Sequence, residues 1–149
     1  MDDATVSDRN DRFEMISACQ EATLVEHAEA VLESSTPVEI LQAPTPQLVM
    51  QQVTEPVNEQ PFNLGEVLTT AAEARVADAK GFAMVAGKAE AKAVAGAIVD
   101  AAVAAEHPRS TAIATDLEAA GADYRQRRRQ EWAESQATTV EFSSMEGEE

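Results

Sequence analysis

Cysteine, histidine and aromatic residues are scarce in this chain of 149 residues. The single cysteine, Cys19, excludes an intrachain disulfide and argues against a cysteine-rich zinc site. With His27 and His107 as the only histidines, the sequence offers no histidine cluster, and no catalytic group of residues is recognisable. Aromatic residues make up 4% of the chain whereas 29 residues are alanine, which predicts a core of small side chains on helices. We therefore expect no metal, no cofactor and no catalytic residue on this chain.

Basic residues are also few, because 11 Lys and Arg stand against 27 Asp and Glu and give a formal net charge of −16. Binding to nucleic acid or to an anionic membrane surface requires basic groups, so the composition argues against both functions. The longest uncharged run near the middle, residues 93–99, is far too short to span a membrane, and the acidic start is unlike a signal peptide. We expect a cytoplasmic protein.

The acidic residues are concentrated towards the two ends of the chain. Residues 61–130 carry equal numbers of acidic and basic groups, whereas residues 131–149 contain six acidic residues and no Lys or Arg. We expect acidic tails at residues 1–7 and 144–149 and a single domain over residues 8–143. A composition that is acidic, rich in alanine and poor in lysine is typical of proteins from a halophile, where salt screens self-repulsion. An ordinary acidic bacterial protein is the alternative.

Hydrophobic periodicity predicts helices in three parts of the chain. Residues 8–34 follow a helical spacing and form one bent helix or two short ones, because the polar pair Gln20-Glu21 permits a break. The clearest helix covers residues 88–106 and is apolar on nearly all sides, so it should be covered on several faces. Asp116 is a suitable N-cap for a further helix that reaches about residue 136.

Alternating apolar residues and turn residues predict a small sheet. Strands are expected at residues 38–42 and 47–53, with Leu48 and Met50 as apolar positions and a turn at Pro44-Thr45-Pro46 between them. Residues 55–61 read as a loop, and strands at 64–76 and 82–85 form a hairpin. The run at 138–142 is β-prone. The order predicts an α+β fold: an N-terminal helical segment, a small, mostly antiparallel sheet, two longer helices packed on it and a short C-terminal strand.

Two features invite a functional interpretation that the sequence does not favour. Gly87-Lys88 lies between a predicted strand and a predicted helix, but the other positions of a phosphate-binding loop are missing. A glycine turn beside a solvated lysine is the better interpretation. Cys19 falls on the apolar side of the first helix, which favours a buried structural thiol over a nucleophile.

Arginines gather in one segment of this acidic chain. At helical spacing, Arg125, Arg128 and Arg129 share one face with Trp132, and an arginine could stack on the tryptophan. This face is a candidate contact for a partner or for a phosphorylated ligand. The alternative is pairing with glutamates of the same chain on a solvated helix.

Several motifs, taken in order, resemble the PhnG subunit family of the phosphonate carbon–phosphorus lyase complex. They are Phe62-Asn63-Leu64-Gly65-Glu66 with Thr70 and Arg75, then residues 81–88 from Gly81 through Gly87 to Lys88, then Asp100 in the alanine-rich helix, and finally residues 137–145. The resemblance covers about residues 10–147.

The resemblance implies a subunit that assembles with PhnH-, PhnI- and PhnJ-like proteins, with a PhnL-like protein assisting. Such an assembly uses ATP as a substrate and forms α-D-ribose 1-methylphosphonate 5-triphosphate, a transferase reaction of phosphonate catabolism. The resemblance implies no catalytic residue on this chain. Two other hypotheses remain open: a stand-alone acidic interaction module or assembly chaperone, and a small independent enzyme with a pocket of perturbed carboxylates.

Overall fold

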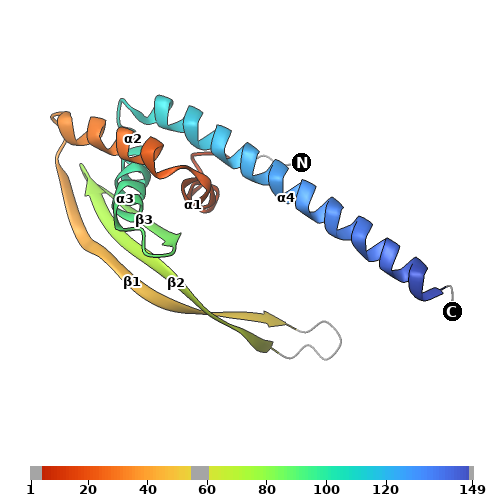
Figure 1. The fold of residues 1–149 in the computed structure, drawn as a ribbon. Coiled ribbons are helices and arrows are strands. Elements are labelled where there is room, and N and C mark those ends of the chain that lie inside the picture. Colours follow the sequence, from red (N-terminus) through yellow and green to blue (C-terminus); the bar gives the residue numbers. More distant parts are fainter. Residues whose placement is uncertain (1–4, 55–60, 148–149) are drawn as a thin grey trace.

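A computed structural model describes residues 5–54 and 61–147 and has the expected α+β architecture (Figure 1). In chain order, the elements are α1 (Arg9–Ala18), α2 (Glu21–Glu33), β1 (Val38–Thr54), β2 (Pro61–Val76), β3 (Ala79–Ala86), α3 (Glu90–Ala104) and α4 (Ser110–Gly147).

The N-terminal helical segment consists of two short helices, the second of the two forms expected from the sequence. Asp8 caps α1 by accepting a hydrogen bond from Asp11 N–H, and α1 ends at Cys19 in an extended conformation. Gln20 is also extended and starts α2 without a side-chain cap. The break therefore lies at the polar position that the sequence indicated. Val6, just before α1, is buried in the hydrophobic core.

The three strands form an antiparallel sheet in the order β1-β2-β3. The predicted turn at Pro44-Thr45-Pro46 is wrong: β1 runs through it as one long strand, with register shifts between Ile40 and Gln42 and between Gln42 and Thr45. Proline is tolerated here because β1 is an edge strand and the irregular register absorbs the missing N–H groups. The hairpin turn lies at Ala77 and Asp78, so β3 is longer than expected.

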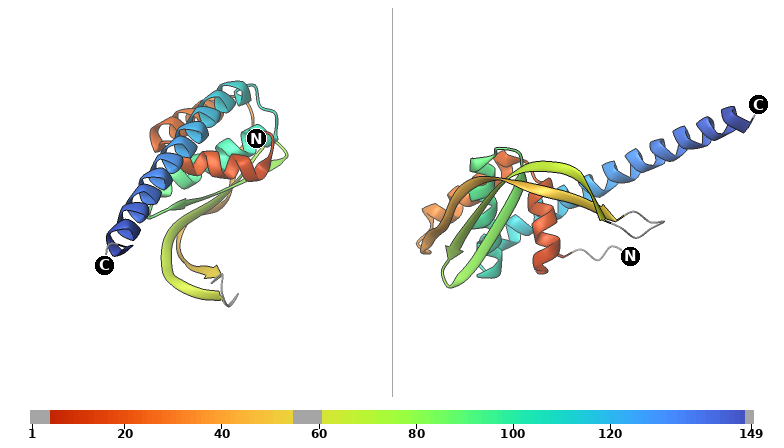
Figure 2. Two further views of the ribbon diagram at one scale, coloured as in Figure 1. Left: turned by 90° about the vertical axis from the view of Figure 1, so that its right-hand side faces the viewer. Right: turned by 90° about the horizontal axis from the view of Figure 1, so that it is seen from below.

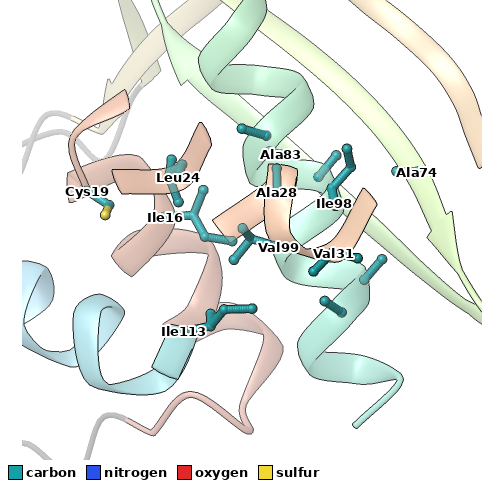
Figure 3. Close-up of a cluster of buried hydrophobic side chains, with 14 of the residues drawn as sticks. Ile16, Cys19, Leu24, Ala28, Val31, Ala74, Ala83, Ile98, Val99 and Ile113 are labelled. Atoms are coloured by element: carbon teal, nitrogen blue, oxygen red, sulfur yellow. The ribbon is translucent and has the colours of Figure 1, made fainter. Parts of the chain in front are cut away.

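Helix α3 lies on the inner face of the sheet, and α1 and α2 cover the side of α3 that faces away from the sheet (Figures 1 and 3). The core is built largely from alanine and small aliphatic residues, as the composition predicted. Its largest fully buried side chains are Met15, Ile16, Leu24, Ile98, Ile113 and Leu117. The sheet and α3 approach each other closely: a Cβ added to Gly96 of α3 would lie 3.0 Å from the Cβ of Ala83 in β3.

Helix α4 differs from its prediction at both ends. It begins at Ser110, directly after the loop that contains His107 and Pro108, so Asp116 lies within the helix and is not its N-cap. The strand expected at residues 138–142 is also wrong, because α4 continues to Gly147. A short β-prone run needs a neighbouring strand to satisfy its backbone groups, whereas the helix satisfies them within the segment.

Two parts of the molecule project from the body (Figures 1 and 2). β3 pairs only with Thr69–Val76, so the β1–β2 hairpin extends past it as a two-stranded arm, here defined as residues 48–54 and 61–68. The second projecting part is the distal half of α4. Beyond Gly121, none of the α4 side chains that the structure describes is buried.

Candidate functional site

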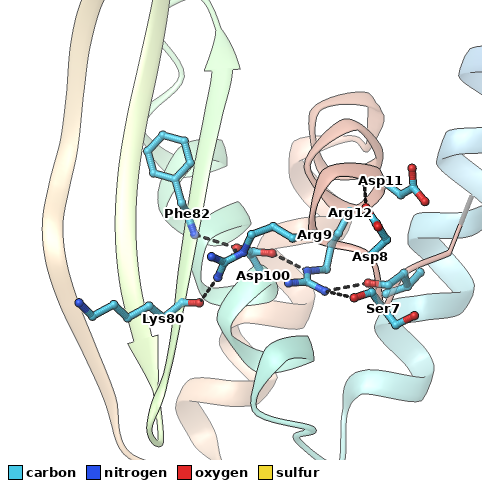
Figure 4. A network of polar contacts seen from close by, with 9 residues as sticks. Ser7, Asp8, Arg9, Asp11, Arg12, Lys80, Phe82 and Asp100 are labelled. Carbon is cyan, nitrogen blue, oxygen red and sulfur yellow. Dashed lines mark hydrogen bonds and ion pairs between the residues drawn. The ribbon is translucent and has the colours of Figure 1, made fainter.

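A buried ion pair joins α1 to α3 (Figure 4). Arg12 Nε donates to Asp100 Oδ1, and both side chains are almost fully buried. Arg12 Nη1 also donates to the carbonyl oxygen of Val6 at 2.8 Å, which holds the segment before α1 against the body. Because each charge is paired and further hydrogen-bonded, this cluster is compatible with the interior.

The same aspartate closes part of the outer edge of β3 (Figure 4). Phe82 N–H donates to Asp100 Oδ2 at 2.8 Å, and Arg9 Nη2 donates to the carbonyl oxygen of Lys80 at 2.7 Å. Unpaired edge groups can template pairing with another strand, and here side chains of the same chain occupy them. Asp100, a residue of the family motif, thus holds the fold together at this edge.

Two further motif residues, Gly81 and Thr70, set the contact between the sheet and α3. A Cβ on Gly81 would lie 2.2 Å from the backbone nitrogen of Ala101, so glycine is required for this close approach. Thr70 Oγ1 donates to the carbonyl oxygen of Gly87 at 2.7 Å and accepts from Ala89 N–H at 3.0 Å. Ala89 is the N-cap of α3 and provides no capping side chain, and the Thr70 hydroxyl satisfies the backbone N–H of Ala89 just before the helix begins.

The remaining motif residues lie along β2 and at the start of α3. Gly65 and Gly87 have positive φ values of 135° and 78°, which favour glycine. Lys88 is exposed beside Gly87, and Glu66 is exposed on the arm. Arg75 Nη1 donates to Glu39 Oε2 at 3.2 Å across the outer face of the sheet. The backbone of Phe62, Asn63 and Leu64 belongs to β2, but their side chains lie outside the described residues.

The arm carries an apolar surface that no other part of the described chain covers. Leu68 lies two residues before the buried Thr70 and therefore on the same face of β2, the face that α3 covers further along. Leu48 pairs with Leu68 across the strands and is 63% exposed, and Met50 next to it is 54% exposed. The inner face of the sheet thus continues past its helices. Sequence alternation identified Leu48 and Met50 as apolar positions but gave no signal that they lack a cover.

The four residues of the predicted arginine face are exposed or half-buried along one stretch of α4. Arg128 Nη1 donates to the Tyr124 hydroxyl at 3.1 Å, and its guanidinium lies 5.9 Å from the centre of that ring. This hydrogen bond raises the pKa of Arg128. Arg128 therefore contacts the tyrosine one turn earlier in the helix. Trp132 is 66% exposed.

A groove of about 250 Å³ separates α1 from α4 beside this face. Its polar lining combines Arg125 and Arg128 of α4 with Asp11 and Glu14 of α1. Mixed charge makes the groove a poorer site for a phosphate than the arginines alone suggested. Arg129 and Trp132 lie outside its lining and are exposed. The structure therefore brings two of the four predicted residues to a groove and leaves the other two on an open surface.

A serine and a histidine that are distant in sequence lie together, but not as a nucleophile and base. His107 Nδ1 accepts from Arg109 N–H at 3.0 Å, so the ring proton is on Nε2, which donates to Ser34 Oγ at 3.1 Å. Ser34 Oγ in turn donates to the carbonyl oxygen of Val31. A ring nitrogen that already donates to the hydroxyl cannot take its proton. The pair fixes the loop before α4.

Among the residues that the structure describes, Cys19 and the acidic side chains form no reactive or metal-binding arrangement. Burial raises the pKa of the Cys19 thiol, which keeps it neutral and unreactive, as predicted for a structural thiol. Within the described ranges, no three His, Cys, Asp or Glu residues gather as metal ligands. The described helices include none that combines the length and the apolar character needed to cross a membrane.

Comparison with known proteins gives one family. The family model described as phosphonate metabolism protein PhnG matches residues 7–147, nearly the whole chain. The search of curated proteins found no match to this chain. The match includes the strands, α3 and the motif residues whose packing roles are described above. The chain therefore belongs to the PhnG family of phosphonate metabolism proteins.

Proposed function

We propose that this chain is a non-catalytic or co-catalytic subunit of the carbon–phosphorus lyase core complex. In that role it takes part in the ATP-dependent transferase reaction that forms α-D-ribose 1-methylphosphonate 5-triphosphate. Its partners are PhnH-, PhnI- and PhnJ-like subunits, with a PhnL-like protein assisting. ATP is a substrate of the assembly, and this chain supplies binding surface. Membership of the PhnG family supports the pathway, and the surface of the chain supports the role of a subunit.

The observation that carries the proposal is the uncovered inner face of the arm (Figure 2). Leu48, Met50 and Leu68 are large apolar side chains on a two-stranded hairpin that leaves the body. Exposed apolar surface of this kind marks a binding interface. Glu66 is the only charged residue in the two strand segments of the arm, and the sequence between them adds Glu55 and Glu59. The arm therefore fits an apolar surface of a partner and does not need a basic one.

The arginine face of α4 supplies a second, polar contact. Residues 125–129 carry four arginines, in contrast to the negative charge of the chain as a whole. Partner proteins with acidic surfaces would be repelled by most of this molecule but attracted to this segment. The arm and the arginine face thus offer a partner an apolar and a charged contact.

Capture of partners from co-expressed subunits at high salt tests the proposal. The wild-type chain should recover PhnI- and PhnJ-like subunits in a fixed ratio. The double variant Leu48→Ser with Leu68→Ser removes apolar surface from the arm and should lower recovery about tenfold or more, because each buried leucine contributes about 1.5–3 kcal/mol. Leu32→Ser on α2 is a matched control, since Leu32 is 54% exposed but lies away from the arm. This control should leave recovery unchanged.

Recovery of the chain by itself, as a stable monomer indifferent to ATP, would contradict the proposal. The acidic interaction module or assembly chaperone would then be the better hypothesis. Equal loss of recovery in the arm variant and in Leu32→Ser would show that the arm is not the contact.

A further inference from the structure

The direction in which α4 leaves the body is decided over a short stretch at its start. Ile113 and Leu117 are fully buried, and Gly121 packs against Met15, where an added Cβ would lie 3.1 Å from Met15 Cγ. From Gly121 to Gly147 the helix extends a further 40 Å or so, at 1.5 Å per residue. A tilt of about 10° at the start would therefore move the far end by about 7 Å. The hydrophobic effect itself has no preferred bond direction, so a polar contact at this point adds a directional restraint to the packing.

A directional contact at this point involves a buried histidine of α2. Arg109 Nε donates to His27 Nδ1 at 3.1 Å, and since arginine only donates, Nδ1 must be the acceptor. The ring proton is then on Nε2, which donates to Asp116 Oδ2 at 2.6 Å. The His27 side chain is 4% exposed. One imidazole thus connects α2 to the loop before α4 and to the second turn of α4, in a single tautomer.

The loop partner of this histidine is itself held in place. Arg109 N–H donates to His107 Nδ1, and His107 contacts Ser34 at the end of α2. The carbonyl oxygen of Arg109 accepts from Ile113 N–H in the first turn of α4. Arg109 therefore cannot move without moving the start of α4. The two contacts of His27, one with Asp116 and one with Arg109, fix the helix on two sides of the imidazole.

We infer that His27 is a positioning residue: through Asp116 and Arg109 it sets the direction of α4. The arginine face begins at Arg125, about one turn past the last buried residue of α4, so it inherits this direction. That this direction matters for partner binding rests on the proposed function. The setting of the direction itself belongs to the isolated chain and is tested there.

The experiment measures a distance between the body and α4 by pulsed electron spin resonance. Spin labels are attached at Lys88→Cys and Gln130→Cys, both exposed, in a Cys19→Ala background. Asp116→Ala should shift or broaden the distance distribution by about 2 Å or more, because residue 130 lies about 14 Å past Gly121 and a tilt of about 10° moves it by that amount. Asp123→Ala removes an exposed aspartate from the same helix, where it pairs with an arginine one turn on, and should leave the distribution unchanged.

Two further variants separate direction from simple loss of packing. Asp116→Asn keeps an oxygen that accepts from His27 Nε2 and should restore the wild-type distribution. Arg109→Met keeps much of the length of the side chain but loses the Nε donor to His27 Nδ1. It removes the contact on the ring nitrogen opposite to the one that Asp116 binds, so it should also shift the distance distribution. Far-UV circular dichroism confirms that each variant remains helical.

An unchanged distribution in both Asp116→Ala and Arg109→Met would overturn the inference. Partner capture is read separately in the same variants. If the distances shift but even the wild-type chain captures no subunit, the proposed function fails and the positioning role stands. If capture falls together with the shift, both are supported.

Discussion

The two halves of β2 have the same backbone pairing with β1 but very different surroundings. Under α3, the inner face of β2 is formed by Thr70, Ala72 and Ala74, all fully buried. Past the end of β3, the same face carries Leu68, paired with Leu48, and both are exposed. Small side chains stand where the chain covers itself, because α3 approaches too closely for larger ones. Large apolar side chains stand where it does not, which is the reverse of what burial within one chain would select.

Charged residues show the same contrast. In the body, Arg12 and Asp100 pair while almost fully buried. On the projecting part of α4, Arg127 pairs with Asp123 at 3.1 Å with both side chains mostly exposed. Neither charge of the first pair has access to water, so removing one partner would leave the other buried and unpaired. The second contributes little to stability, because solvent screens both charges.

The largest effect should come from breaking the buried pair. Asp100→Ala leaves Arg12 charged and buried and removes the acceptor of Phe82 N–H. We expect the free energy of unfolding to fall by about 3–5 kcal/mol, as measured by chemical denaturation. The control is Glu39→Ala, which breaks the exposed Arg75–Glu39 pair and should cost less than about 1 kcal/mol. Equal costs would mean that burial does not distinguish the two pairs.

The second prediction, of intermediate size, concerns the salt dependence of stability, which should differ between the body and the arm. Lowering the salt concentration from about 1 M to 0.1 M lengthens the screening distance from about 3 to about 10 Å, which exposes the net charge of −16 to self-repulsion. We expect the melting temperature to fall by several degrees. Amide exchange within the arm should change little while the protein is folded, because its two strand segments carry one charge. A melting temperature independent of salt would contradict the interpretation as a protein of a halophile.

The smallest effect on stability should come from the arginine face. Arg128→Glu together with Arg129→Glu changes two exposed side chains, so the free energy of unfolding should stay within about 0.5 kcal/mol. Partner capture should nevertheless weaken, because the change reverses the charge of a binding surface. Unchanged co-purification of the double variant would remove this face from the proposed interface.

Local patterns predicted those parts of the fold that depend on neighbouring residues. The break near Gln20, the alanine-rich helix that became α3, and the buried Cys19 all follow from spacing and polarity along one segment. The continuous β1 could not be predicted from local turn chemistry, because Pro44 and Pro46 are tolerated only at a sheet edge. The start of α4 was misplaced for a similar reason: Asp116 is a good cap by type, but tertiary structure uses it to bind His27.

The sequence by itself determined the α+β class, the acidic surface, the small-residue core and the PhnG-family motifs, since each is written in composition or short-range order. Only the tertiary structure decided what the motif residues do. The ion pair between Arg12 and Asp100 joins residues 88 positions apart, and the His27–Asp116 contact joins residues 89 apart. The tertiary structure also decided which apolar residues stay uncovered. Periodicity marks a face as apolar, but coverage depends on where distant helices end, and no local pattern carries that information.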